Sequence, residues 1–172
     1  ISSFDVQTVF VGPRLRYKPS VADIQFTIET QSQDLFQSYF NLPPERTVLT
    51  GCAKVGLVQQ VARTLDRDAV RTLVDMQDKR LLVFACSPFL EEDQLIIESN
   101  AAGLATMPEA RLAIRLHPTA KPGYPEYLAQ LTARNSAIFA LDKLDLPQTM
   151  IAADILITRF SNVGLEAALV ET

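Results

Sequence analysis

Residues 153–169 read ADILITRFSNVGLEAAL, in which a short apolar run is followed by a polar turn and a second apolar pattern. The run at 155–157 contains β-branched residues and is too short for a helix, which favours a buried strand. Ser161 and Asn162 are residue types that cap helices, and the apolar positions after them predict a helix. A strand that enters a helix in this way points free backbone N–H groups, and the positive end of the helix dipole, at an anion site. Glu166 follows about one turn into the helix, where it either accepts hydrogen bonds from sugar hydroxyls or is an ordinary solvated carboxylate.

The composition describes an ordinary globular protein of 172 residues, with 48% hydrophobic residues and a net charge of −4. That length suits one domain, or one domain with part of another. The mild acidity and the lack of a basic run argue against nucleic-acid binding. The two cysteines, Cys52 and Cys86, make no disulfide framework and indicate free thiols in a reducing compartment, which predicts a cytoplasmic protein. No apolar stretch approaches the roughly 20 residues that a membrane-spanning helix needs.

Apolar runs and helical periodicities alternate from residue 47 onward, with strands expected near residues 47, 81, 111, 137 and 154. Such alternation is typical of parallel strands joined by right-handed crossovers, with helices on both faces of the sheet. The sequence therefore predicts an α/β fold, a Rossmann-like three-layer sandwich with a mostly parallel sheet. Residues 1–43 do not continue the pattern and are expected to be the tail of a preceding domain plus a linker. Residues 44–172 are expected to form the Rossmann-like domain, truncated at its C-terminal end.

Two local features add to this picture. The helical periodicity over residues 56–76 is interrupted near Asp66, which is expected to cap a second helix. Nearer the N-terminus, residues 6–11 predict a strand. Arg14, Arg16 and Lys18 then form a small basic patch that is either solvated or faces a cleft between domains.

The residues that directly follow the expected strands are the first candidates for a site. In parallel sheets of this kind, ligands bind at the carboxyl ends of the strands, where the strand order reverses. The residues at these ends are Gly51, Ser87, His117, Asp142 and Ser161.

His117 is the only histidine, and it follows an expected strand directly. Pro118 restricts the backbone of His117 to an extended shape, which fixes the ring at the end of the strand. An imidazole in that place can donate to a phosphate oxygen or transfer a proton. The alternative is a strand-end histidine that bonds a backbone carbonyl.

The loop TGCAKVG at residues 50–56 contains Gly51 and Lys54. It lacks both the spacing of a dinucleotide fingerprint and the GK[ST] sequence of a phosphate loop. Gly51 would let the chain approach a ligand and Lys54 would meet a phosphate, but a plain tight turn is the alternative. One histidine and two separated cysteines give no metal-ligand spacing, and no G-x-S-x-G sequence supports a Ser-His-Asp triad.

Three stretches together resemble the donor-binding C-terminal half of a two-domain glycosyltransferase of the GT-B architecture. Residues 44–51, PERTVLTG, resemble the linker and first strand of that half. Residues 115–118, RLHP, resemble its HP motif, and residues 154–167 resemble its closing motif with a serine and a glutamate. The likeness is to bacterial polysialyltransferases, capsule transferases and CDP-glycerol glycerophosphotransferases, and it covers roughly residues 40–172.

The resemblance implies that His117 and Ser161 hold the phosphate of a nucleotide-linked donor, helped by Asn162 and the helix N-terminus, and that Glu166 contacts the ribose. The implied substrate is a CMP-, CDP- or UDP-linked sugar or polyol, with no cofactor and no metal. The general base of such enzymes lies in the N-terminal half, so that half is the expected partner and no catalytic residue is assigned in this chain. Acceptors are often lipid-linked, which implies a parent enzyme peripheral to the inner membrane. The remaining candidate donor-binding residues are Gly51, Ser87 and Lys54.

The chain departs from this family in two ways, and two rival interpretations stay open. A single Ser161 is followed by Asn162 where some relatives have paired serines, and the chain ends before the last helix that usually crosses back to the N-terminal half. A UDP-N-acetylglucosamine 2-epimerase-like protein shares the architecture, but its closing motif usually has a Ser-Gly-Gly run and paired glutamates. A non-catalytic, receiver-like binding domain would need acidic residues where this chain has Gly51 and Ser87. The donor-site hypothesis requires His117 and Ser161 to lie near each other.

Overall fold

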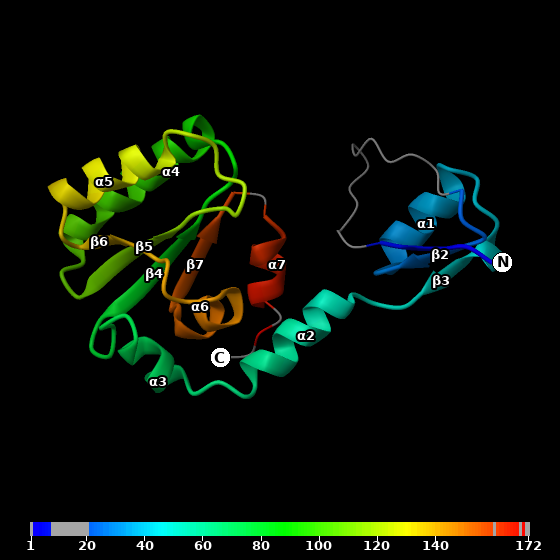
Figure 1. The fold of residues 1–172 in the computed structure, drawn as a ribbon, viewed down its shortest axis with the longest axis horizontal. Helices are drawn as coiled ribbons and strands as arrows, with labels where there is room; N and C mark the ends of the chain where they lie inside the picture. The colour runs from blue at the N-terminus through cyan, green and yellow to red at the C-terminus, as the bar shows by residue number, and fades with distance from the viewer. Residues whose placement is uncertain (1, 8–20, 160, 169, 171–172) are drawn as a thin grey trace. The chain divides into compact units, whose positions relative to one another are not determined.

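The computed structural model describes residues 2–7, 21–159, 161–168 and 170. The chain divides into two units, Ile1–Leu57 and Val58–Thr172 (Figure 1). The expected strand at residues 6–11 falls mostly outside the described residues, as does the basic patch of Arg14, Arg16 and Lys18.

The first unit holds a parallel three-stranded sheet of β1 (Phe4–Val6), β2 (Ile24–Thr27) and β3 (Thr47–Leu49), in the order β1-β2-β3. Helix α1 (Thr30–Ser38) and a 3-10 turn (Pro44–Arg46) connect β2 to β3. Pairing of β3 with β2 corrects the expectation that this strand opens the sheet of the C-terminal domain. One short helix is enough to return the chain beside the strand it has just left, so β3 completes a local β-α-β unit. The assignment of residues 1–43 to the tail of a preceding domain plus a linker, and of residues 44–172 to the Rossmann-like domain, stays a prediction.

The second unit holds a parallel four-stranded sheet of β4 (Arg80–Ala85), β5 (Ala110–Arg115), β6 (Ile138–Ala140) and β7 (Ile155–Thr158). The strand order is β6-β5-β4-β7, so the chain moves outward from β4 to β6 and then returns to the other side of β4. The reversal places a topological switch point between β4 and β7. The expected α/β class and parallel sheet are confirmed.

Helices cover both faces of this second sheet (Figure 1). Asp66 caps one of them as expected, because its side chain accepts hydrogen bonds from the backbone N–H groups of Asp68 and Ala69. A three-layer sandwich results, with α4 and α5 on one face and α3, α6 and α7 on the other. The helices are α2 (Ala53–Ala62), α3 (Arg67–Thr72), α4 (Leu90–Gly103), α5 (Tyr124–Arg134), α6 (Leu146–Ala152) and α7 (Asn162–Ala168), with a 3-10 turn at Leu104–Thr106.

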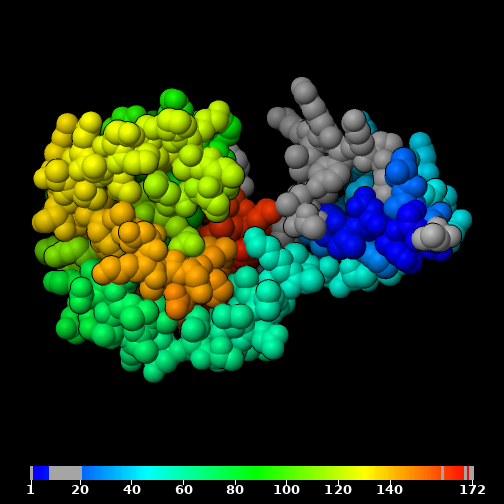
Figure 2. All heavy atoms as spheres, in the orientation of Figure 1, coloured from blue at the N-terminus to red at the C-terminus, as the bar shows by residue number. Residues whose placement is uncertain are grey.

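The alternation of side chains along β4 divides the core into two halves. Leu81 and Val83 point to the core under α3 and α6, whereas Leu82 and Phe84 point to the core under α4 and α5. All four side chains are buried, which explains why the sequence of this strand is a continuous apolar run. Figure 2 shows α3 (green) and α6 (orange) next to each other on one face of this unit, where both contribute to the same core.

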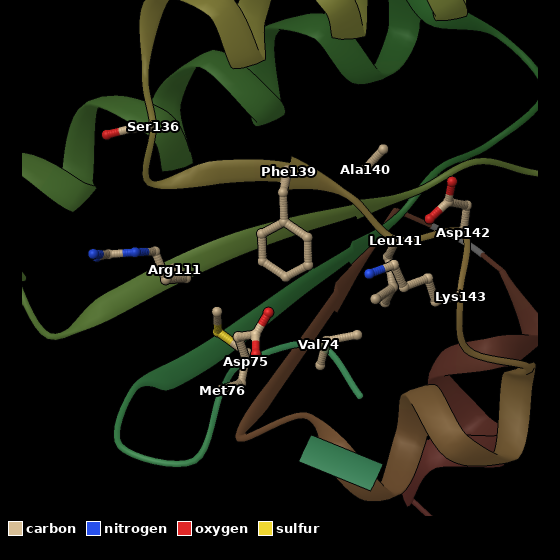
Figure 3. Close-up of a pocket in the computed structure, with 10 residues that line it drawn as sticks. All are labelled: Val74, Asp75, Met76, Arg111, Ser136, Phe139, Ala140, Leu141, Asp142 and Lys143. Carbon is tan, nitrogen blue, oxygen red and sulfur yellow. The ribbon is translucent and has the colours of Figure 1, made fainter. Parts of the chain in front are cut away.

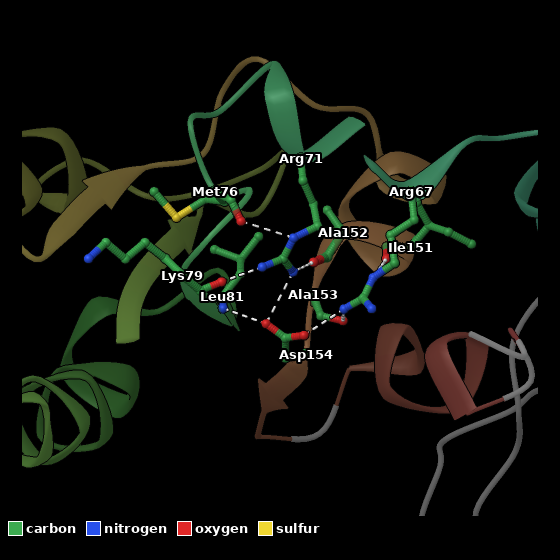
Figure 4. Close-up of polar contacts among 9 residues, drawn as sticks. All are labelled: Arg67, Arg71, Met76, Lys79, Leu81, Ile151, Ala152, Ala153 and Asp154. Atoms are coloured by element: carbon green, nitrogen blue, oxygen red, sulfur yellow. Dashed lines mark hydrogen bonds and ion pairs between the residues drawn. The ribbon is translucent and has the colours of Figure 1, made fainter. Parts of the chain in front are cut away.

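A charged cluster joins β4 and β7 at their amino ends (Figure 4). The buried guanidinium of Arg71 donates to three backbone carbonyls and, at 3.1 Å, to Oδ2 of Asp154. Asp154 also accepts from the backbone N–H of Leu81 at 2.7 Å and from Arg67 at 2.6 Å. Burial works to raise the pKa of Asp154, but these hydrogen bonds and the charge of Arg71 hold it below its ordinary value.

Candidate functional site

A pocket of about 260 Å³ lies at the carboxyl ends of β4, β5 and β7. Ser87 follows β4, His117 follows β5 and Ser161 follows β7, so the pocket collects side chains from three neighbouring strands at the switch point. The requirement that His117 and Ser161 lie near each other is therefore met. The other described residues that line it are Pro88, Thr158, Arg159 and Asn162.

His117 is held in one orientation by a residue just downstream. Its Nδ1 accepts a hydrogen bond from the backbone N–H of Thr119 at 3.1 Å and lies 2.9 Å from the Thr119 hydroxyl. Because a backbone N–H can only donate, Nδ1 carries no proton in this arrangement, and a neutral ring then carries its proton on Nε2. The alternative of a histidine that bonds a backbone carbonyl is not what the described contacts show. His117 instead offers an Nε2–H donor.

Ser161 caps the helix that follows it, as its sequence position predicts. Its Oγ accepts from the backbone N–H of Val163 at 3.3 Å, and its carbonyl accepts from the N–H of Gly164 at 3.1 Å. A serine hydroxyl has one donor and two acceptor positions, so capping leaves the O–H available to donate to a ligand. A Cβ on Gly164 would lie 3.0 Å from Cγ2 of Thr158, so a glycine lets α7 approach the end of β7 closely.

Hydrogen bonds with buried polar groups hold the turn that carries Ser87 in place. The Ser87 N–H donates to Oδ2 of Asp93, and the Tyr124 hydroxyl lies 2.6 Å from the same oxygen and 3.0 Å from the Ser87 carbonyl. Asp93 and Tyr124 are fully buried. Burial, then the bond to Asp93, raises the pKa of Tyr124, and burial raises the pKa of the Cys86 thiol to about 12. These groups thus form a static support, and Cys86 is an unreactive thiol.

Arg159, like Pro88 and Thr158, lines this pocket although the sequence did not single it out. It directly follows β7, and its Nη1 lies 2.8 Å from Oε2 of Glu92 in the first turn of α4. Its type and position after a strand were visible in the sequence, but the pairing with a residue of α4 was not. The described lining therefore combines hydroxyls, an amide, an imidazole and a guanidinium with no carboxylate, which favours an anionic ligand.

The other predicted site residues are not among the described residues that line this pocket. Glu166 is only 2% exposed and is not among the described lining residues, so its contact with a ribose stays a prediction. Gly51 and Lys54 belong to the first unit, and their place in the same site also stays a prediction. Gly51 has a φ of +76° and open space around its Cβ position, so backbone conformation is what favours glycine there.

Asp142 lines a second, larger pocket of about 410 Å³ beside the edge strand β6 (Figure 3). Phe139 forms its apolar centre, while Asp75, Lys143 and Arg111 add charges of both signs around it. This mixed lining shows no preference for an anion, unlike the pocket at the switch point. We therefore place the candidate site at the smaller pocket on chemical grounds.

Among the described residues, no three His, Cys, Asp or Glu side chains are grouped to hold a metal ion. None of the helices in the described part of the chain has the length and apolar character that crossing a membrane requires.

Comparison with known proteins yields structural relatives only. No family model and no curated protein sequence matches the chain. The wall teichoic acid polymerase TagF, in a crystal soaked with CDPG, matches with a TM-score of 0.56 and 20% identity, over 85% of this chain and 35% of TagF. A putative UDP-N-acetylglucosamine 2-epimerase from Listeria monocytogenes matches with a TM-score of 0.64 and 17% identity, over 85% of this chain and 40% of the epimerase.

A third structure is the UDP-GlcNAc 2-epimerase from Neisseria meningitidis bound to UDP-GlcNAc, with a TM-score of 0.59 and 12% identity, over 85% and 41% of the two chains. The chain thus spans well under half the length of these relatives. At such identities the likeness establishes the fold. The protein has the Rossmann-like α/β fold found in GT-B enzymes.

Proposed function

We propose that this chain is the donor-nucleotide-binding half of a glycosyl- or polyol-phosphate transferase for bacterial surface polysaccharide synthesis. The observation that carries the proposal is the pocket at the switch point, where His117, Ser161 and Asn162 offer hydrogen-bond donors and none of the described lining residues is a carboxylate. Its volume of about 260 Å³ is below the roughly 300–1,000 Å³ of pockets that enclose whole small molecules. The pocket therefore suits the phosphate end of a CMP-, CDP- or UDP-linked donor.

The chemistry of this proposal is electrostatic. An acceptor hydroxyl attacks the transferring centre of the donor, a bond to the acceptor oxygen forms, and the bond to the nucleotide phosphate breaks. His117 and Ser161 stabilise the negative charge that develops on that phosphate, without a metal or a cofactor. The acceptor proton goes to a general base contributed by the N-terminal half of the enzyme, so this chain alone is not expected to turn over.

The remaining predicted residues have secondary places in the proposal. Ser87 forms one wall of the pocket through its turn, and the roles of Gly51 and Lys54 in donor binding stay predictions. Glu166 would contact the ribose only if its buried carboxylate became accessible. We propose that the parent enzyme is cytoplasmic and peripheral to the inner membrane.

An epimerase acting on UDP-N-acetylglucosamine is the second candidate, because two epimerases share the fold with TM-scores of 0.64 and 0.59. Such an epimerase would also bind a nucleoside diphosphate at the switch point. The two candidates differ in the reaction of the full enzyme, and preferred binding of a cytidine nucleotide would favour the transferase. A non-catalytic α/β binding domain is the third hypothesis. Under this hypothesis we expect no nucleotide binding at this pocket.

The experiment is a thermal-shift titration of this chain with CMP, CDP, UMP, UDP and GDP, followed by calorimetry with the nucleotide that stabilises it most. A ligand that binds the folded state raises the melting temperature by mass action, so even roughly millimolar affinity registers at high concentration. We expect stabilisation by cytidine or uridine nucleotides, with loss of the ligand-dependent shift in His117→Ala and Ser161→Ala. Ser136→Ala, an exposed serine at the other pocket, is the matched control. A folded protein that no nucleotide stabilises would contradict the proposal.

A further inference from the structure

Among the described residues that line the pocket, Arg159 is the one with a permanent charge. It directly follows β7, beside the turn that contains Ser161, so its guanidinium lies on the same side of the switch point as the predicted phosphate ligands. The nearby cation Lys121 is engaged elsewhere, since its ammonium lies 4.3 Å from the centre of the Phe89 ring. A guanidinium is well suited to phosphate, because its planar N–H groups match two oxygens at once.

Glu92 already places a carboxylate on this guanidinium. It belongs to the acidic first turn of α4, the helix that follows the Ser87 turn, and its Oε2 lies 2.8 Å from Nη1 of Arg159. The ion pair therefore spans the switch point from the β4 side to the β7 side. The side chains are 34% and 42% exposed, so water and salt screen the pair and its net stabilisation is small.

We infer that Arg159 is a phosphate-binding residue of this pocket and that Glu92 is a competing anion, which donor phosphate displaces when it binds. This inference rests on the proposed function, because the ligand is the phosphate of a nucleotide-linked donor. The exchange keeps the guanidinium paired in both states, once with a carboxylate and once with a phosphate oxygen. Because Glu92 competes for Arg159, it lowers the affinity for phosphate, and the loss of its charge strengthens binding.

The alternative relation between the two residues predicts the opposite effect. If Glu92 served to hold Arg159 in the orientation that phosphate needs, removal of the carboxylate would weaken binding. The exposed geometry of the pair favours exchange over permanent support, since an ion pair that supports a fold is usually buried. Asp93 next to it in sequence has that supporting geometry, being fully buried against the Ser87 turn.

The test measures affinity for CDP, UDP and inorganic pyrophosphate by calorimetry in Glu92→Gln and Arg159→Gln. We expect Glu92→Gln to bind about two- to fivefold more tightly, the range expected when an exposed ion pair no longer competes. Arg159→Gln is expected to bind about tenfold more weakly or worse, because a charge-assisted hydrogen bond is lost. The gain in Glu92→Gln should shrink as salt is added.

Two charge-matched controls separate the local contact from the overall field. Glu91→Gln removes the same charge from the same turn of α4, and Arg134→Gln removes an exposed guanidinium at the end of α5. Both controls should bind within about twofold of wild type, since screened charges at a distance act weakly.

The outcomes also separate this inference from the proposed function. If the wild-type protein binds none of the three probes, the proposed function fails. If His117→Ala loses binding while Arg159→Gln keeps wild-type affinity, only the role of Arg159 is overturned. Weaker or unchanged binding in Glu92→Gln overturns the competition.

Discussion

At each end of strand β7 an arginine pairs with a carboxylate, and the two pairs differ in burial and in the partners around them. At the amino end, the side chain of Arg71 is buried, with 8% exposure. It donates to backbone carbonyls, and its partner Asp154 accepts from a backbone N–H (Figure 4). At the carboxyl end, Arg159 and Glu92 make one described ion pair at 34% and 42% exposure, beside an open pocket. The buried cluster at the amino end stabilises the sheet, whereas the exposed pair at the carboxyl end is the one that we propose a ligand exchanges.

The largest expected effect comes from the same substitution made at both ends. Arg71→Met should lower the free energy of unfolding by about 3–5 kcal/mol, because three backbone carbonyls lose their buried guanidinium donor and Asp154 keeps only Arg67 and Leu81 as partners. Arg159→Met should change it by less than about 1 kcal/mol, because its pair is exposed. Chemical denaturation followed by circular dichroism measures both.

Equal losses of stability in the two variants would erase the distinction between an architectural pair and an exchangeable one. If Arg71→Met does not fold at all, Arg67→Met gives an intermediate case at the same cluster, since its side chain is 40% exposed. Its loss should fall between the other two.

A smaller effect is expected from packing at the carboxyl end. Gly164→Ala would place a Cβ 3.0 Å from Cγ2 of Thr158, whose hydroxyl is bonded to the Ala85 carbonyl at 3.3 Å and resists rotation. Overpacking costs about 1–3 kcal/mol, and the helix preference of alanine over glycine offsets about 1 kcal/mol. We expect a net loss of about 1 kcal/mol in the free energy of unfolding.

The matched variant Thr158→Ser removes Cγ2 and keeps the hydroxyl. In that background Gly164→Ala should become neutral or stabilising, because the steric conflict is gone and the helix preference remains. Urea denaturation of the four proteins gives the coupling energy. Additive effects would mean that Gly164 is not needed for the close approach of α7 to β7.

Local pattern predicted most of this fold because the decisive interactions are local or periodic. The apolar run of β4 and the capping position of Asp66 can both be recognised from a few neighbouring residues. The carboxyl-end rule then placed Ser87, His117 and Ser161 at one edge of the sheet before the structure was known, and one pocket does contain all three.

Interactions between distant segments were out of reach of that reasoning. Arg71 and Asp154 lie 83 residues apart, and nothing near either one indicates the other. The ion pair of Arg159 with Glu92 was missed for the same reason, and so was the pairing of β3 with β2. Asp93 resembled any acidic residue in the first turn of a helix, although it is buried beneath Ser87.

The smallest expected effect is a change in how stability depends on pH at the amino end. The folded pKa of Asp154 is below the ordinary value of 3.8, so the unfolded chain takes up this proton more readily than the folded protein. The contribution of the carboxylate is therefore complete above pH 3.8 and is lost as the pH falls through the lower folded pKa. We expect the difference in unfolding free energy between wild type and Asp154→Asn to be constant near neutral pH and to shrink in acid. Glu92→Gln should differ little from wild type in stability at neutral pH, because its pair is exposed. If the Asp154→Asn difference persists undiminished at the most acidic pH at which both proteins fold, the side chain acts through its shape and hydrogen bonds rather than through its charge.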